Sequence, residues 1–67
     1  MRKLTLKAAR AVADMTQDEV ADKMGVSRQC ISLWENGKTR ISHEQLERFC
    51  EVVGLKVGEI FLPRRIA

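Results

Sequence analysis

The sequence has little of what enzymes need. Its 67 residues contain no tyrosine, one histidine and one proline, and they include no glycine-rich phosphate loop. The candidate nucleophile–base pair, Cys50 and His43, falls on one expected helix with about 10 Å between the two positions along the axis. That distance is too long for a hydrogen bond between them. The composition therefore disfavours an enzyme, and we expect neither a catalytic residue nor a cofactor.

Cysteines and long apolar runs are also scarce. Cys30 and Cys50 match no zinc-ligand spacing, so no metal site is expected. No apolar run approaches the roughly 20 residues of a membrane span, and Lys7 and Arg10 interrupt any signal-peptide core after Met1. We therefore expect a cytoplasmic protein without a membrane segment, whose thiols stay reduced.

A modest basic excess is present, with 12 Lys and Arg against 9 Asp and Glu and a formal net charge of +3. The basic residues crowd the N-terminus and flank one central segment: Arg2, Lys3, Lys7 and Arg10, then Arg28, Lys38 and Arg40. This distribution is compatible with a nucleic-acid partner. Charge that serves only solubility explains it equally well.

Apolar residues recur at helical spacing almost throughout, and no stretch alternates like a strand. The pattern predicts one all-α domain of five helices over residues 1–67. The first helix is expected from about Thr5 to Ala13, with four residues on its apolar face: Leu6, Ala9, Val12 and Ala13. A short last helix is expected around residues 57–61, ended by Pro63.

Capping signals separate the helices between these two. A capping box over residues 16–19 opens the second helix, and Gly25 closes it in the left-handed conformation. Ser27 caps a third helix that turns Ile31 and Trp34 inward.

The third helix stops at Asn36-Gly37, and residues 38–41 form a polar loop. A second capping box over residues 42–45 opens the fourth helix, which Gly54 closes. Its apolar stripe has four members: Leu46, Phe49, Cys50 and Val53.

Residues 17–36 form the most informative unit. Ala21 is small where the second and third helices would cross, and Gly25 makes the tight turn between them. The outer face of the third helix is left to Arg28, Gln29, Ser32, Leu33 and Asn36. A helix that stands out from a rigid support in this way has the width to enter a DNA major groove.

This unit resembles the lambda-repressor/Cro-like (XRE-type) helix-turn-helix DNA-binding family, whose repressors and Cro proteins exemplify this motif. Three segments carry the resemblance: the Thr-Gln-Asp-Glu-Val-Ala start, the Gly-Val-Ser-Arg-Gln turn and the Ile-Ser-Leu-Trp-Glu-Asn-Gly-Lys end. The likeness extends over about residues 4–62, and the shortness of the chain is similar to phage and prophage regulators. The resemblance implies a sequence-specific regulator of transcription, most simply a repressor, that binds double-stranded operator DNA.

The same resemblance implies roles for individual residues. Four lie where the family contacts base edges: Arg28, Gln29, Ser32 and Leu33. Five lie where it contacts the DNA backbone: Gln17, Ser27, Asn36, Lys38 and Arg40. A structural ion pair between Arg10 and Glu35 is expected to fix the recognition helix, although two separate exposed charges are the alternative.

Three positions depart from the family pattern. Asp14 stands in a turn that often holds glycine, and Asp tolerates the left-handed region. Ile41 stands in a loop that often contains proline, which leaves the path of Lys38 and Arg40 open. Cys30 replaces a small hydroxyl residue and is interpreted as a packed side chain rather than a redox switch.

The C-terminal segment is rich in apolar residues. Leu55, Ile60 and Phe61 are expected in the core, whereas Val57, Leu62 and Ile66 are expected to meet a second copy. The hypothesis is a homodimer, weak without DNA, on a pseudo-palindromic site; a tail that seals a monomer is the alternative.

An antitoxin-like or antirepressor-type protein-interaction module with the same fold is the rival function.

Overall fold

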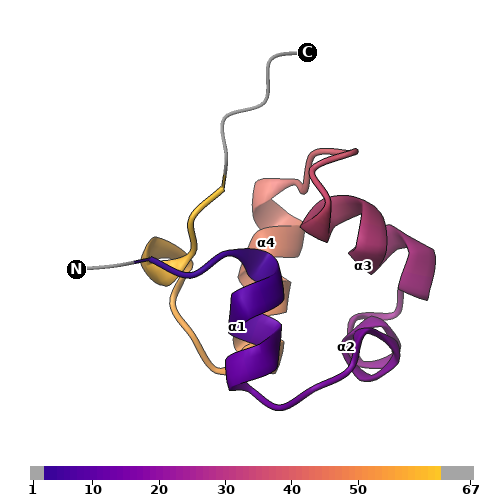
Figure 1. The fold of residues 1–67 in the computed structure, drawn as a ribbon, viewed down its shortest axis with the longest axis horizontal. Coiled ribbons are helices and arrows are strands. Elements are labelled where there is room, and N and C mark those ends of the chain that lie inside the picture. The colour runs from indigo at the N-terminus through magenta and orange to yellow at the C-terminus, as the bar shows by residue number, and fades with distance from the viewer. Residues whose placement is uncertain (1–2, 63–67) are drawn as a thin grey trace.

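Four α-helices follow one another along residues 3–62, the part of the chain that the computed structural model describes (Figure 1). They are α1 (Leu6–Val12), α2 (Gln17–Met24), α3 (Arg28–Glu35) and α4 (His43–Val53). The all-α class is confirmed. The fifth helix is only a 3-10 turn, η1 (Val57–Glu59). Arg2, Pro63 and Ile66, named above, lie outside the described residues.

The helices begin at the predicted caps. Thr16 Oγ1 accepts a hydrogen bond from the Glu19 N–H at 3.1 Å, and the Glu19 carboxylate accepts one from the Thr16 N–H at 2.8 Å. Ser27 Oγ accepts from the Cys30 N–H at 3.1 Å. The second capping box, over residues 42–45, is also formed. Each cap satisfies backbone groups that the first turn of a helix leaves without a partner.

Left-handed residues stand at the turns on either side of α2. Gly25 closes α2 with φ of 74°, which glycine adopts without the steric cost of a side chain. Asp14, between α1 and α2, has φ of 59° and is the only non-glycine residue with positive φ in the described chain. Asp is among the few side chains that adopt this conformation readily. The two connections are only four and three residues long, so successive helices stay adjacent.

One apolar core lies between the helices. α2 packs on α3 and α4, α1 packs on α3, and η1 closes the end of α4. The buried residues are Leu6, Ala9, Val20, Ala21, Met24, Ile31, Trp34, Ile41, Leu46, Phe49, Cys50 and Ile60. The inward orientation of Ile31 and Trp34 is confirmed, and it turns the opposite side of α3 to solvent.

Val12 does not join this core, contrary to the expectation. Its side chain is 68% exposed, while Leu6 and Ala9 of the same helix are buried. At about 100° per residue, Val12 lies about 120° around the helix from Leu6. The two-turn helix α1 buries only the narrower stripe of Leu6 and Ala9.

The prediction for Phe61 is also wrong, because this side chain is 49% exposed. The chain after η1 is extended: Leu4 and Ile60 form an isolated parallel bridge, and the Phe61 N–H donates to the Leu4 carbonyl at 2.7 Å. Successive side chains of an extended segment point to opposite sides. Ile60 takes the inward position and is 5% exposed, so Phe61 points outward. Leu55 is half-buried against the core.

No helix within residues 3–62 has both the length and the apolar character needed to cross a membrane.

Replacing Trp34 by Ala tests this packing. Trp34 is 7% exposed, and truncating a buried tryptophan typically lowers the free energy of unfolding by about 3–5 kcal/mol. For a domain of this size that loss approaches the whole stability. Urea unfolding followed by far-ultraviolet circular dichroism measures it. The matched control is Val12→Ala, whose exposed side chain should change the unfolding free energy by less than about 0.5 kcal/mol. Equal effects in the two variants would contradict the assigned orientation of α3.

Candidate nucleic-acid interface

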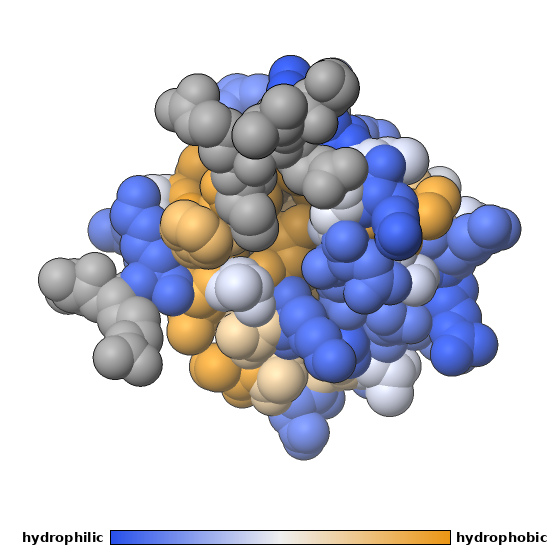
Figure 2. All heavy atoms as spheres, turned by 45° about the horizontal axis from the view of Figure 1, so that its top comes forward, coloured by the Kyte–Doolittle hydropathy of each residue, from blue (hydrophilic) through white to orange (hydrophobic). Residues whose placement is uncertain are grey.

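The outer face of α3 carries the residues expected to contact bases. Arg28 and Gln29 are exposed, whereas Ser32 and Leu33 are half-buried. α3 lies at the edge of the molecule, with the other helices on one side only (Figure 1). In Figure 2 hydrophilic side chains cover the right of the view, the side on which α3 lies in Figure 1. The structure therefore exposes Arg28 and Gln29, and part of Ser32 and Leu33, on the outer side of α3.

The support for this face is the close contact of α2 with α3. In α2, which packs on α3, Ala21 is 4% exposed and Val20 is fully buried. The Val26 N–H donates to the Ala21 carbonyl at 3.0 Å, which ties the turn back onto α2. A small residue at a helix crossing lets two backbones approach closely. The orientation of α3 is therefore set by this backbone hydrogen bond and by the buried side chains of the core.

A partly buried ion pair joins α3 to α1. Arg10 Nε lies 2.6 Å from Glu35 Oε2 and Arg10 Nη2 lies 3.2 Å from Glu35 Oε1, a two-pronged contact. The side chains are only 15% and 3% exposed. The hydrogen bond to Glu35 raises the pKa of Arg10, burial acts in the opposite direction, and the charge of Glu35 raises it further.

Two further hydrogen bonds extend this ion pair. Arg10 Nη1 donates to the Met15 carbonyl at 3.0 Å, and Gln17 Nε2 donates to Glu35 Oε1 at 2.9 Å. Glu35 thus accepts from α1 and from the first residue of α2 at once. The cluster holds the last turn of α3 against both helices, so it serves the scaffold and leaves the outer face of α3 open.

The candidate backbone-contacting residues divide into two groups. Three have side chains already hydrogen-bonded within the domain: Gln17 to Glu35, Ser27 to the N–H of Cys30, and Asn36 to Ser32. Asn36 Nδ2 donates to Ser32 Oγ at 3.3 Å and stays exposed at the end of α3. Lys38 and Arg40 are exposed in the following loop, and neither forms an ion pair with any residue of 3–62.

Ile41 determines the path of that loop. Its side chain is 8% exposed and belongs to the core. The Lys38 N–H also donates to the Leu33 carbonyl at 2.9 Å, which begins the loop close to α3. The loop is therefore fixed at both ends, and its Lys38 and Arg40 are exposed to solvent.

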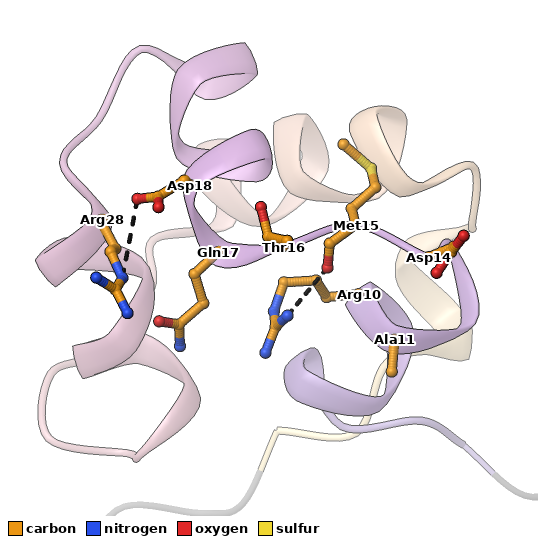
Figure 3. Close-up of a pocket in the computed structure, with 8 residues that line it drawn as sticks. All are labelled: Arg10, Ala11, Asp14, Met15, Thr16, Gln17, Asp18 and Arg28. Atoms are coloured by element: carbon orange, nitrogen blue, oxygen red, sulfur yellow. Dashed lines mark hydrogen bonds and ion pairs between the residues drawn. The ribbon is translucent and has the colours of Figure 1, made fainter.

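One contact at this face was not anticipated from the sequence. Asp18, in the first turn of α2, reaches across to Arg28 at the start of α3, with 3.8 Å between Asp18 Oδ1 and Arg28 Nε (Figure 3). Both residues line an open hollow of about 580 Å³ beside the start of α2. Ten positions separate them in the chain, and sequence spacing does not fix a distance across a turn.

The remaining candidates lie away from this face. His43 is exposed at the start of α4, with its Nε2 3.2 Å from Glu47, whereas Cys50 is buried in the core and burial raises its pKa. Cys30 is half-buried and packs against the core. Across the described residues, no three His, Cys, Asp or Glu side chains cluster closely enough to hold a metal ion.

Comparisons with known proteins agree with this geometry. A family profile described as "Helix-turn-helix" matches residues 6–60. The chain is 39% identical over 57 residues to an uncharacterized HTH-type transcriptional regulator of Methanocaldococcus jannaschii. The matched segment covers 85% of this chain and 86% of that protein. A similarly named protein of Archaeoglobus fulgidus is 35% identical, over 85% of this chain and 80% of its own. The antitoxin PezA of Streptococcus pneumoniae is 33% identical over 82% of this chain but only 35% of its own length.

Glu35→Ala tests this cluster. The change leaves the half-buried Arg10 guanidinium without its carboxylate partner, which should lower the free energy of unfolding by about 1–3 kcal/mol. Urea unfolding followed by the emission of Trp34 measures the loss. The control is Glu47→Ala, which removes an exposed carboxylate from the His43 pair and should change stability by less than about 0.5 kcal/mol. A loss in Glu35→Ala no larger than in the control would show that the cluster contributes little to the fold.

Proposed function

The chain belongs to the helix-turn-helix family, and on this premise we propose that it is a sequence-specific double-stranded-DNA-binding regulator of transcription. The observation that carries the proposal is the accessible outer face of α3, which is supported from behind by Ile31 and Trp34. A single helix of this kind fits the width of a major groove. The relatives named as HTH-type transcriptional regulators support the same function.

In this proposal α3 enters the major groove with its N-terminal half foremost. Arg28 donates two hydrogen bonds to the edge of a guanine, and Gln29 pairs with an adenine through its amide. Ser32 contacts either kind of base edge, and Leu33 packs on a thymine methyl group. Their placement on one face of α3 lets all four engage successive base pairs of one half-site.

The backbone contacts would come from residues at the edges of this face. Lys38 and Arg40 supply positive charge to phosphates from the loop after α3. Asn36 and Ser27 lie at the two ends of α3. In this proposal they contact the backbone of the same DNA strands. Gln17 is the first residue of α2, so its backbone N–H lies at the positive end of a helix dipole even though its side chain binds Glu35.

We propose repression as the outcome, in the cytoplasm where the DNA lies. Occupation of an operator that overlaps a promoter is sufficient to exclude RNA polymerase, whereas activation needs a further contact surface.

We also propose that the protein binds as a homodimer. One α3 reads only a few base pairs, and two-fold pairing places two recognition helices about 34 Å apart, one turn of DNA. Phe61 and Leu62 support this proposal, because they are 49% and 41% exposed near the C-terminal end of the described chain. Figure 2 shows hydrophobic side chains gathered on the left of the view, on the opposite side from α3. Val57 is half-buried against the core, so it contributes less to a partner surface than expected.

A protein-binding role remains the second candidate function. The similarity to the antitoxin PezA favours it, since that protein carries a matching segment within a longer chain. The same exposed Phe61 and Leu62 would then meet a different protein. The exposed polar face of α3 favours DNA as the partner of that face in either case.

Single alanine replacements in α3 and in the loop separate base reading from phosphate binding. Arg28→Ala or Gln29→Ala should weaken binding to the best duplex by about 1–3 kcal/mol and relax the preference at the base that each contacts. Lys38→Ala should weaken binding to all duplexes alike and reduce the salt dependence. Selection from random duplexes, followed by titrations at several salt concentrations, measures both. Unchanged affinity and preference in the α3 variants would refute the recognition helix.

Sedimentation with and without the selected duplex tests the dimer. Two protomers per duplex and a two-fold-symmetric site are expected, with partial dissociation in the absence of DNA. Phe61→Ser should reduce the dimer without unfolding the domain, because the side chain is half exposed. A single protomer per duplex at saturation, on a site without two-fold symmetry, would rule the dimer out.

A further inference from the structure

From the contact between α2 and α3 we infer that Asp18 is a positioning residue that sets the base specificity of Arg28. The inference rests on the proposed function, because it concerns how the recognition helix reads DNA. It assigns a role to an acidic residue on a face whose other proposed contacts are basic or neutral.

The geometry supports this assignment. Asp18 Oδ1 faces Arg28 Nε at 3.8 Å, and Figure 3 shows the two side chains directed toward each other across the turn between α2 and α3. A guanidinium has five N–H donors in one plane. A carboxylate beside Nε leaves the two terminal nitrogens at the opposite end of the plane. Those are the donors that a bidentate contact with a guanine edge requires.

The fold itself does not require this carboxylate. The Asp18 side chain is 73% exposed, and the capping box of α2 is formed by Thr16 and Glu19. A negative charge in the first turn of a helix is favourable, but Glu19 already provides one there. The contact with Arg28 is the one ion pair that Asp18 forms among the described residues.

Electrostatics give the contact its effect on DNA binding. In the free protein both side chains are exposed, so water and salt weaken the pair. Docking against DNA removes water from this region, and the attraction at the same distance increases as the effective dielectric constant falls. Asp18 then competes with phosphates for Arg28, because a guanidinium held by a carboxylate binds a phosphate less well. Arg28 is therefore kept from general backbone binding and is directed to a base edge.

Asp18→Asn tests the inference, because it removes the charge and keeps the size of the side chain. Glu51→Gln is the matched control, since it removes one negative charge from an exposed position of α4. The titrations use Asp18→Asn, Glu51→Gln, Arg28→Ala and the Asp18→Asn/Arg28→Ala double variant. Each protein is titrated with the selected duplex, with the same duplex changed at the base that Arg28 reads, and with an unrelated duplex. Thermal unfolding of each variant confirms that the domain stays folded.

In the expected result, Asp18→Asn reduces the preference at the Arg28 base by about three- to thirtyfold, as for other coupled neighbours. It also raises the affinity for the unrelated duplex. Glu51→Gln leaves the preference unchanged, and Asp18→Asn has no effect on preference when Arg28 is already Ala. Equal preference in Asp18→Asn and wild type overturns the inference alone. An unselective wild-type protein overturns the proposed function, and the inference with it.

Discussion

The partly buried contact of Arg10 with Glu35 is the interaction on which the rest of the structure depends. A charge that is removed from water must be paired and hydrogen-bonded. The Glu35 carboxylate, on α3, accepts hydrogen bonds from Arg10 of α1 and from Gln17 of α2. The geometry of three helices is thereby tied to one side chain that is 3% exposed. Since Glu35 is the last residue of α3, the contact fixes the end of the helix whose beginning carries Arg28.

The small size of the domain imposes a second constraint. With four short helices and a 3-10 turn in residues 3–62, each helix can bury only one narrow stripe, and the rest of its surface stays in water. In α3 this stripe is formed by Ile31 and Trp34, and the opposite side is left for polar residues. The scaffold and the proposed DNA-binding face are therefore two sides of the same eight-residue helix. The proposed base contacts therefore need no helix other than α3.

The errors in the sequence-based prediction have different causes. Val12 lies about 120° around α1 from the buried Leu6, and Phe61 follows the inward Ile60 in an extended segment, so both side chains point away from the core. The expected fifth helix is shortened to η1 because the chain after it pairs with the backbone of Leu4 instead of continuing to coil. A partner from the opposite end of the chain decides that outcome, and local spacing contains no information on it. Helix ends and terminal segments are thus less predictable than helix interiors.

The sequence by itself determined the features that depend on neighbours within about four residues: the two capping boxes, the left-handed closure at Gly25, and the inward side of α3. Hydrogen bonds of this range are set by residue type and spacing alone. The family motif also indicated the Arg10–Glu35 pair and the face formed by Arg28, Gln29, Ser32 and Leu33. Only the tertiary structure decided that Gln17 turns its amide to Glu35, that Ile41 anchors the loop, and that Asp18 faces Arg28. These contacts depend on distances across turns, and such distances follow from how the helices pack against one another.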